Sequence, residues 1–411
     1  MSKHRAYLRR SRRRRRRRRI LIVAMLLLLN QKPKSYYYRK LLNEEGRQRR
    51  DRNLIRAALH DPQNSTWEKC FSSGDDGVLI TVTGFDHATF NFMLSHFTPL
   101  FTSYTPWCSK VGGVDGLNYR KLSNEEKRGK KRMVTAKACL GLVLAWYRFR
   151  GAEFVLQGWF GFTGTQCNVW LRFGRRMLLK ALLSIQEAKV QFPSEETIKD
   201  FQKAIRQRHI HLNRVYCFAD GLKLPFEACS GLLQQGMYYN GWTHGHYITN
   251  VFVFGADGTI IDAVLNVPGS VHDSQVASWG GMYDRLKEVY QRTGAICVVD
   301  SAFASANVPY LIRSSDDLTK AADPFEREVM TDATSLRQAA EWGMRAIQSA
   351  FPRLKDHISY EENGERTVIL KLLPLLYNLR CNKVGLNQIR NTYMLSLSKD
   401  ADYYIQRPKE T

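Results

Sequence analysis

The sequence predicts an α/β fold in which a mixed sheet flanked by helices follows a mainly helical domain. Residues 134–208 carry helical patterns of apolar residues. Residues 215–351 instead read as strand, loop, strand, strand, helix, strand, loop, helix. With 411 residues, of which 44% are hydrophobic, the chain is long enough for two or three domains with sizeable cores.

The expected organisation has four parts. They are a basic, disordered arm at 1–60, a mainly helical domain at 61–210, an α/β domain at 211–395 and a tail at 396–411. The arm holds 21 Lys and Arg against 3 Asp and Glu, so it carries most of the net charge of +24. Such an arm either binds phosphate polymers or acidic import partners, or is merely solvated.

The apolar run Ile20–Leu29 follows the arginine block Arg12–Arg19. It is too short to span a bilayer, and no small-residue cleavage site follows it. We therefore favour a short helix beside a nuclear-targeting cluster, with a membrane anchor as the alternative. This interpretation predicts a nuclear protein without a membrane partner.

Cysteines and histidines give no signal for zinc. The eight Cys are scattered without a Cys-x-x-Cys pair, which is typical of reduced thiols. The histidine pairs His209/His211 and His244/His246 lack cysteine partners at zinc spacing, so ordinary histidines are favoured over a structural zinc site.

Within the helical domain, a segment at about 134–183 resembles a helix-turn-helix. Val134–Phe149 predicts a buried helix, and Thr163 to Gln166 forms a capping box before a long amphipathic segment. The polar side of that segment predicts DNA contacts, and an ordinary helix with solvated arginines is the alternative. The residues concerned are Asn168, Arg172, Arg175 and Arg176.

The α/β domain begins with a buried strand at Val215–Ala219. Tyr247–Phe254 and Ile260–Asn266 predict a hairpin, because the Asp-Gly pair between them tolerates positive φ. A helix broken at Gly280 follows at Ser274–Tyr290, and Ala295–Val299 predicts another buried strand.

A long polar loop is expected at 313–333, and a helix is expected to begin at Ser335. Ser335 to Gln338 reads as a capping box, and Pro352 ends the helix. Its apolar stripe consists of Leu336, Ala340, Met344, Ile347 and Phe351. Residues 367–393 predict a closing helical segment.

Four acids stand at the ends or edges of these elements. Asp220 and Asp300 follow the two buried strands, Asp273 lies in a glycine-containing turn, and Glu341 lies beside the apolar stripe of the last helix. Carboxylates gathered in this way suit a pair of hard divalent cations, Mg²⁺ or Mn²⁺. Two such cations about 3.5–4 Å apart stabilise a phosphodiester displacement. We therefore expect a metal-dependent chemistry on nucleic-acid strands.

The motifs around these acids closely resemble those of PIF/Harbinger-type transposases of the DDE endonuclease superfamily, over about residues 130–395. The motifs are Asp220-Gly221, Tyr238-Tyr-Asn-Gly-Trp-Thr-His244, Pro268-Gly-Ser-Val-His-Asp-Ser274, Val299-Asp-Ser-Ala-Phe303, Glu341-Trp-Gly343 and Phe351-Pro-Arg-Leu-Lys355. Two motifs depart from the common form: Asp-Gly-Leu-Lys lacks a Thr-His after the acid, and Val-Asp-Ser-Ala-Phe replaces Gly-Asp-Ser-Gly-Tyr.

The resemblance implies an RNase H-like catalytic domain at 211–395. By matching motif, Asp220, Asp300 and Glu341 are the expected catalytic acids, and Asp273 is an additional metal ligand. Arg345 and Lys355 are further expected DNA contacts. No other cofactor is expected.

The resemblance also implies binding partners, and it leaves one alternative function open. The substrates would be transposon ends and target DNA, with a separate Myb-like DNA-binding protein and a homo-oligomer in the active state. The alternative is a domesticated, non-catalytic nuclear DNA-binding protein that retains the fold. Retention of all four acids argues against this alternative.

Overall fold

The structure is a computed structural model in which a helical region precedes the sheet. It describes residues 54–107, 118–123, 132–228, 231–303, 308–314, 323–359 and 363–394. The chain divides into two compact units, Met1–Ile55 and Arg56–Thr411, and all described residues except Leu54 and Ile55 belong to the second. Most of the predicted basic arm, with Ile20–Leu29, and the tail at 396–411 lie outside the described residues. No helix in the described ranges is long and apolar enough to cross a membrane.

Helices dominate the region before the large sheet, and local capping explains where they begin. The Thr135 side chain accepts a hydrogen bond from the Ala138 amide and starts α7. The predicted capping box at α9 is present, since Thr163 and Gln166 each accept from the other's backbone amide. The elements are η1 Arg56–Ala58, η2 Pro62–Asn64, α3 Thr66–Ser72, α4 Asp76–Thr83, α5 His87–Ser103, β1 Tyr104–Trp107, β2 Asn118–Lys121, α7 Ala136–Arg148, α8 Phe154–Phe160, α9 Gly164–Leu183, η3 Gln186–Ala188 and α10 Glu195–Arg206.

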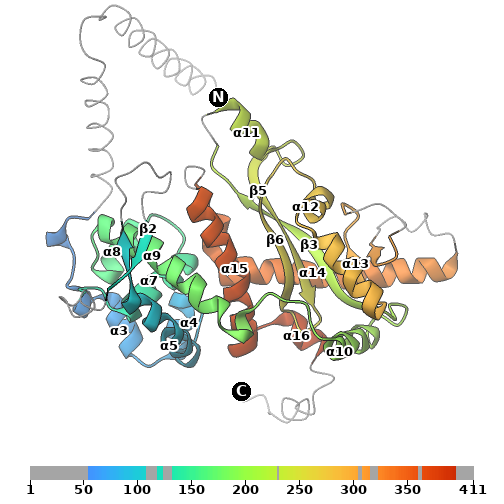
Figure 1. Ribbon diagram of the computed structural model, residues 1–411, viewed down its shortest axis with the longest axis horizontal. Helices are drawn as coiled ribbons and strands as arrows, with labels where there is room; N and C mark the ends of the chain where they lie inside the picture. Colours follow the sequence, from blue (N-terminus) through green and yellow to red (C-terminus); the bar gives the residue numbers. More distant parts are fainter. Residues whose placement is uncertain are drawn as a thin grey trace, which may run out of the picture. The chain divides into compact units, whose positions relative to one another are not determined.

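A six-stranded mixed sheet follows, in the order β4-β5-β3-β7-β8 with β6 paired to β5 (Figure 1). β3, β7 and β8 run parallel, whereas β5 runs antiparallel to β3, β4 and β6. The predicted hairpin is confirmed as β5 and β6, with Gly258 at a φ of +76° in its turn. The strands are β3 Val215–Pro225, β4 Tyr239–Asn240, β5 Gly245–Gly255, β6 Ile260–Pro268, β7 Ile296–Val299 and β8 Leu311–Arg313.

Helices cover this sheet, and most of them follow the sequence pattern. The helix expected at 274–290 is present as two helices, because Gly281 adopts a φ of +68° between them. The helices are α11 Leu232–Tyr238, α12 Asp273–Trp279, α13 Met282–Thr293, α14 Pro324–Ala350, η5 Pro352–Lys355, α15 Asn363–Lys383 and α16 Gln388–Tyr393. The result is a mixed sheet flanked by helices, as the sequence predicts.

The prediction that the helix carrying Glu341 begins at Ser335 is wrong. α14 begins at Pro324, where the Asp323 side chain accepts a hydrogen bond from the Glu326 amide, so part of the expected loop is helical. The Ser-x-x-Gln sequence at 335–338 therefore lies in the helix interior. The predicted apolar stripe from Leu336 to Phe351 is buried as expected, and α14 packs against β3, β5, β7 and β8.

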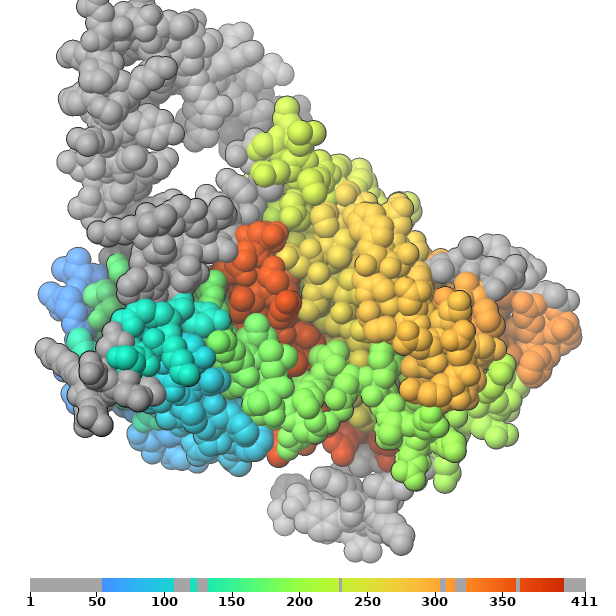
Figure 2. All heavy atoms as spheres, viewed as in Figure 1, coloured from blue at the N-terminus to red at the C-terminus, as the bar shows by residue number. Residues whose placement is uncertain are grey.

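Helix α15 joins the helical region to the sheet. It packs against α9 and against β6, and in Figure 2 its surface lies between the green helices and the yellow strands. The Tyr147 hydroxyl donates to the Ile369 carbonyl at 2.9 Å, and Arg380 Nε donates to the Gly84 carbonyl at 3.0 Å. The division expected at residue 210 therefore falls within one compact unit.

Candidate active site

Asp220 lies on β3, and Asp300 directly follows the neighbouring parallel strand β7 at the matching position. Ala219 of β3 pairs in register with Val299 of β7, and each acid is the next residue. Because side chains alternate across a sheet, residues at matching positions lie on the same face. The two carboxylates therefore share one face of the sheet. β3 continues to Pro225, so Asp220 does not end its strand as the sequence suggested.

Asp273, at the start of α12, lies near enough for its charge to affect Asp220. Its side chain packs against Gly221, where an added Cβ would lie 2.6 Å from Asp273 Oδ2. Any larger residue beside Asp220 would displace this carboxylate. Asp273 Oδ1 is buried and has no hydrogen-bond partner within the described part of the chain. A buried carboxylate oxygen without a donor is costly, which is a reason to expect a cation there.

The proximity of the acids appears in the pKa values of Asp220 and Asp273. Burial, together with the charges of Asp300 and Asp273, raises the pKa of Asp220 to about 6. The Gly221 amide and the Arg337 guanidinium act in the opposite direction. Burial also raises the pKa of Asp273, where Lys223 opposes the rise and Asp300 adds to it. Carboxylates that share a site in this way disfavour one another's charge.

Arg337 lies between the aspartates and Glu341, and the sequence analysis missed it. Its Nη1 donates to Asp300 Oδ1 at 3.1 Å, and its Nη2 lies 3.8 Å from Glu341 Oε1. Arg345 Nη2 lies 3.6 Å from the other oxygen of Glu341. Arg337 precedes Glu341 by four residues, and this spacing could have predicted that the two side chains lie close together on one helix face.

The donor set fits a hard divalent cation, but the ligands are not assembled into one shell. Asp220, Asp273 and Asp300 lie near enough to affect one another's charge, and the bare Asp273 oxygen is the kind of group that such a cation satisfies. Among the described residues, no three acidic, imidazole or thiol groups lie close enough to hold a single ion. Glu341 is engaged by two arginines instead. Asp220, Asp273 and Asp300 are therefore the best-placed residues to hold a cation.

The predicted DNA contacts on α9 divide into two pairs. Asn168 and Arg172 line a cavity. Arg175 is 5% exposed and pairs with Glu365 at 2.8 Å, and Arg176 pairs with the same carboxylate at 2.6 Å. The latter two arginines face a buried acid of α15 rather than an open surface. Arg175 and Arg176 are therefore not part of an exposed DNA-binding face, although Arg175 also lines the cavity.

Arg345 and Lys355 are placed differently. The Arg345 side chain is 77% exposed and continues the chain of charges that runs from Asp300 through Arg337 and Glu341. Lys355 is exposed at the end of η5. Both positions are accessible to a nucleic-acid backbone.

Comparison with known proteins agrees with this arrangement. Residues 219–378 match the model of the DDE superfamily endonuclease family. The matched segment begins one residue before Asp220 and contains all four acids. No curated protein and no solved structure gave a match.

The match places this part of the chain beside a class of nucleases that act on DNA and typically use divalent metals. It indicates a transposase-like nuclease. The matched residues cover the sheet and most of α15, and they do not include the helical region.

Proposed function

We propose that this protein is a divalent-metal-dependent DNA endonuclease and strand transferase of the PIF/Harbinger type, acting at transposon ends. One observation carries the proposal: Asp220 of β3 and Asp300, which directly follows β7, lie at matching positions of two adjacent parallel strands, and Asp273 packs against Gly221 next to Asp220. The motif from Pro268 to Ser274 supports the Harbinger subtype.

Bound Mg²⁺ or Mn²⁺ would polarise the scissile phosphate and activate water or a 3′-hydroxyl. Asp220, Asp273 and Asp300 would hold the cations through their carboxylate oxygens, and Glu341 would complete a shell. Because the pKa of Asp220 is raised to about 6, this carboxyl group becomes fully ionised only near neutral pH. DNA processing should therefore weaken as the pH falls below about 6.

Arg337 has a role in this proposal because it engages the same oxygens that a cation needs. It holds Asp300 and lies near Glu341, and it limits the repulsion among the clustered acids. A guanidinium and a cation would compete for these carboxylate oxygens. Arg337 would be available to a DNA phosphate whenever it is not paired with Asp300, as Arg345 and Lys355 are from their exposed positions.

The biological setting belongs to the same proposal. We expect the active form to be a homo-oligomer in the nucleus, because two transposon ends must be joined. A separate Myb-like protein would supply recognition of the end sequence. The basic arm would add contacts to DNA phosphates.

The test is nicking of supercoiled plasmid in Mg²⁺ or Mn²⁺, a reaction that requires no recognition of an end sequence. The wild-type protein should nick, and Asp300→Asn should not, because the substitution removes one carboxylate charge from the site. Asp200→Asn, an exposed acid on α10, is the matched control and should nick like the wild type. Equal nicking by wild type and Asp300→Asn would refute the assigned site.

A second candidate is a DNA-binding protein that no longer cuts. The engagement of Asp300 and Glu341 by Arg337 favours it, because the arginine stands where a ligand shell would form. In that case the protein should bind DNA without nicking it in either metal, and Arg337→Gln should not restore nicking.

A further inference from the structure

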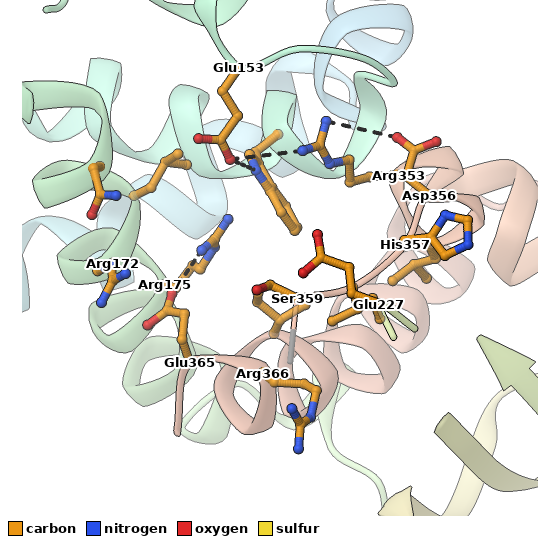
Figure 3. A pocket seen from close by; sticks show the side chains of 16 residues that line it. Glu153, Arg172, Arg175, Glu227, Arg353, Asp356, His357, Ser359, Glu365 and Arg366 are labelled. Carbon is orange, nitrogen blue, oxygen red and sulfur yellow. Dashed lines mark hydrogen bonds and ion pairs between the residues drawn. The ribbon is translucent and has the colours of Figure 1, made fainter. Parts of the chain in front are cut away.

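A second polar cavity lies apart from the carboxylate site and shares no residue with it. It has a volume of about 240 Å³ and lies where α7 and α9 meet η5 and α15 (Figure 3). Its lining includes Trp146, Asn168, Arg172, Arg175, Glu227 and Arg353. Its size suits a small group rather than a large ligand.

Arg175 is a buried donor with unused hydrogen-bonding capacity in this cavity. It is only 5% exposed, and its Nη1 donates to Glu365 Oε1 at 2.8 Å. Its Nε and Nη2 have no hydrogen-bond partner within the described residues. These two nitrogens form one edge of the guanidinium, and that edge binds two oxygens of one oxyanion side by side. Buried donors left without acceptors are costly, so an acceptor pair at these two nitrogens would be stabilising.

The plane of this guanidinium is fixed in advance. Arg175 stacks on the Trp146 ring at 3.9 Å, and Arg353 lies 5.1 Å from the same ring. The Trp146 Nε1 donates to Glu153 at 2.9 Å, which holds the indole in place. A preorganised guanidinium loses little side-chain entropy when a ligand binds.

The charges around the cavity define the kind of anion it can take. Glu365 is shared by Arg175 and Arg176, so one carboxylate faces two guanidiniums. In Figure 3, Glu227 points toward the open centre of the cavity. A carboxylate at that position disfavours a multiply charged anion. The best ligand therefore has low charge, two oxygens for Arg175, and hydrogen-bond donors on its far side.

We propose that this cavity binds a phosphate ester, with two phosphate oxygens on the Nε and Nη2 of Arg175. The choice of phosphate over carboxylate rests on the proposed function, because DNA is then the polyanion that the protein meets. The ester can come from a DNA strand or from a free nucleotide. The group would bind at the junction of the helical region and the sheet, next to Asn168 and Arg172.

The experiment is calorimetric titration in EDTA, so that neither metal nor cleavage contributes. The ligands are thymidylyl-thymidine as a DNA fragment, thymidine 5′-monophosphate as a free nucleotide, thymidine and acetate. We expect at least one phosphate ester to bind more tightly than acetate, and thymidine not to bind. The tighter of the two esters identifies the source. Asp300→Asn should bind it like the wild type, which separates this site from the proposed nuclease centre.

Two variants and one control locate the binding. Arg175→Lys keeps the charge but loses the two-nitrogen edge, so affinity should fall about tenfold. Leu171→Trp narrows the cavity and leaves Arg175 and Glu365 in the chain, and it should have the same effect. Arg176→Lys changes the other partner of Glu365 and should retain affinity within about twofold. The proposal is overturned if neither ester binds at millimolar concentration, if both cavity variants bind like the wild type, or if the control loses affinity equally.

Discussion

At the scale of single residues, the ionised side chain of buried Asp220 destabilises the folded protein. Burial and two neighbouring acids raise its pKa to about 6, from an ordinary value of 3.8. The folded protein therefore holds this proton more tightly than the unfolded chain. Stability from this group is fully present below about pH 4 and is lost as the pH rises through about 6.

Asp220→Asn should accordingly stabilise the metal-free protein at neutral pH. The gain should grow between about pH 4 and pH 6 and reach at most about 3 kcal/mol, since a tenfold change in proton affinity corresponds to about 1.4 kcal/mol. Urea unfolding at about pH 5 and pH 7.5 measures it. A variant less stable than the wild type at both pH values would show that Asp220 is not destabilised by its surroundings.

Residue identity predicted the aspartates of the site, but it did not predict what surrounds them. Asp220 and Asp300 follow apolar runs that read as strands, so their shared face could be inferred. The contact between Arg337 and Asp300 joins residues 37 positions apart, and it depends on how α14 packs on the sheet. The partner of Arg175 could not be predicted for the same reason, because Glu365 is 190 residues away in the sequence.

At the scale of elements, α14 shows how a local signal can mislead. Ser335 and Gln338 have capping-box spacing, and the polar residues before them suggested a loop. The actual N-cap is Asp323, followed by Pro324 at the first position of the helix. Long helices with a solvated first part lack the apolar periodicity that marks their start. The hairpin of β5 and β6 was predictable because its turn residues and apolar runs are contiguous.

The two possible N-termini of α14 predict opposite effects on stability for substitutions at Asp323 and Ser335. Asp323→Ala should cost about 1 kcal/mol, because it removes the acceptor for the Glu326 amide. Ser335→Ala should be neutral or stabilise by up to about 0.5 kcal/mol, because Ser335 is an exposed interior position and alanine favours helix. Urea unfolding of both variants decides between them. A loss at Ser335 with none at Asp323 would support the later start.

At the scale of the whole molecule, the helical region and the sheet are stabilised as one unit through α15. Glu365 of α15 is buried and pairs with both Arg175 and Arg176 of α9. Removing its charge leaves two largely buried guanidiniums without their carboxylate. Sequence patterns delimit each region, but they do not show that a buried ion cluster joins them.

Glu365→Gln should therefore destabilise the protein by about 3–5 kcal/mol, as expected when one partner of a buried ion pair is lost. Glu195→Gln is the matched control, because Glu195 pairs with Arg292 at 3.1 Å with both side chains more than half exposed. That change should cost less than about 1 kcal/mol. Equal losses in the two variants would mean that the α9–α15 junction does not stabilise the unit.

The central claim is that the clustered aspartates hold the divalent cation used to cut DNA. Electron paramagnetic resonance of Mn²⁺ binding tests it most directly, because it requires neither the correct DNA end nor a partner protein. The wild type and Asp200→Asn should bind Mn²⁺ alike, and Asp220→Asn and Asp300→Asn should bind it at least about tenfold more weakly. Undiminished Mn²⁺ binding by both site variants would contradict the claim.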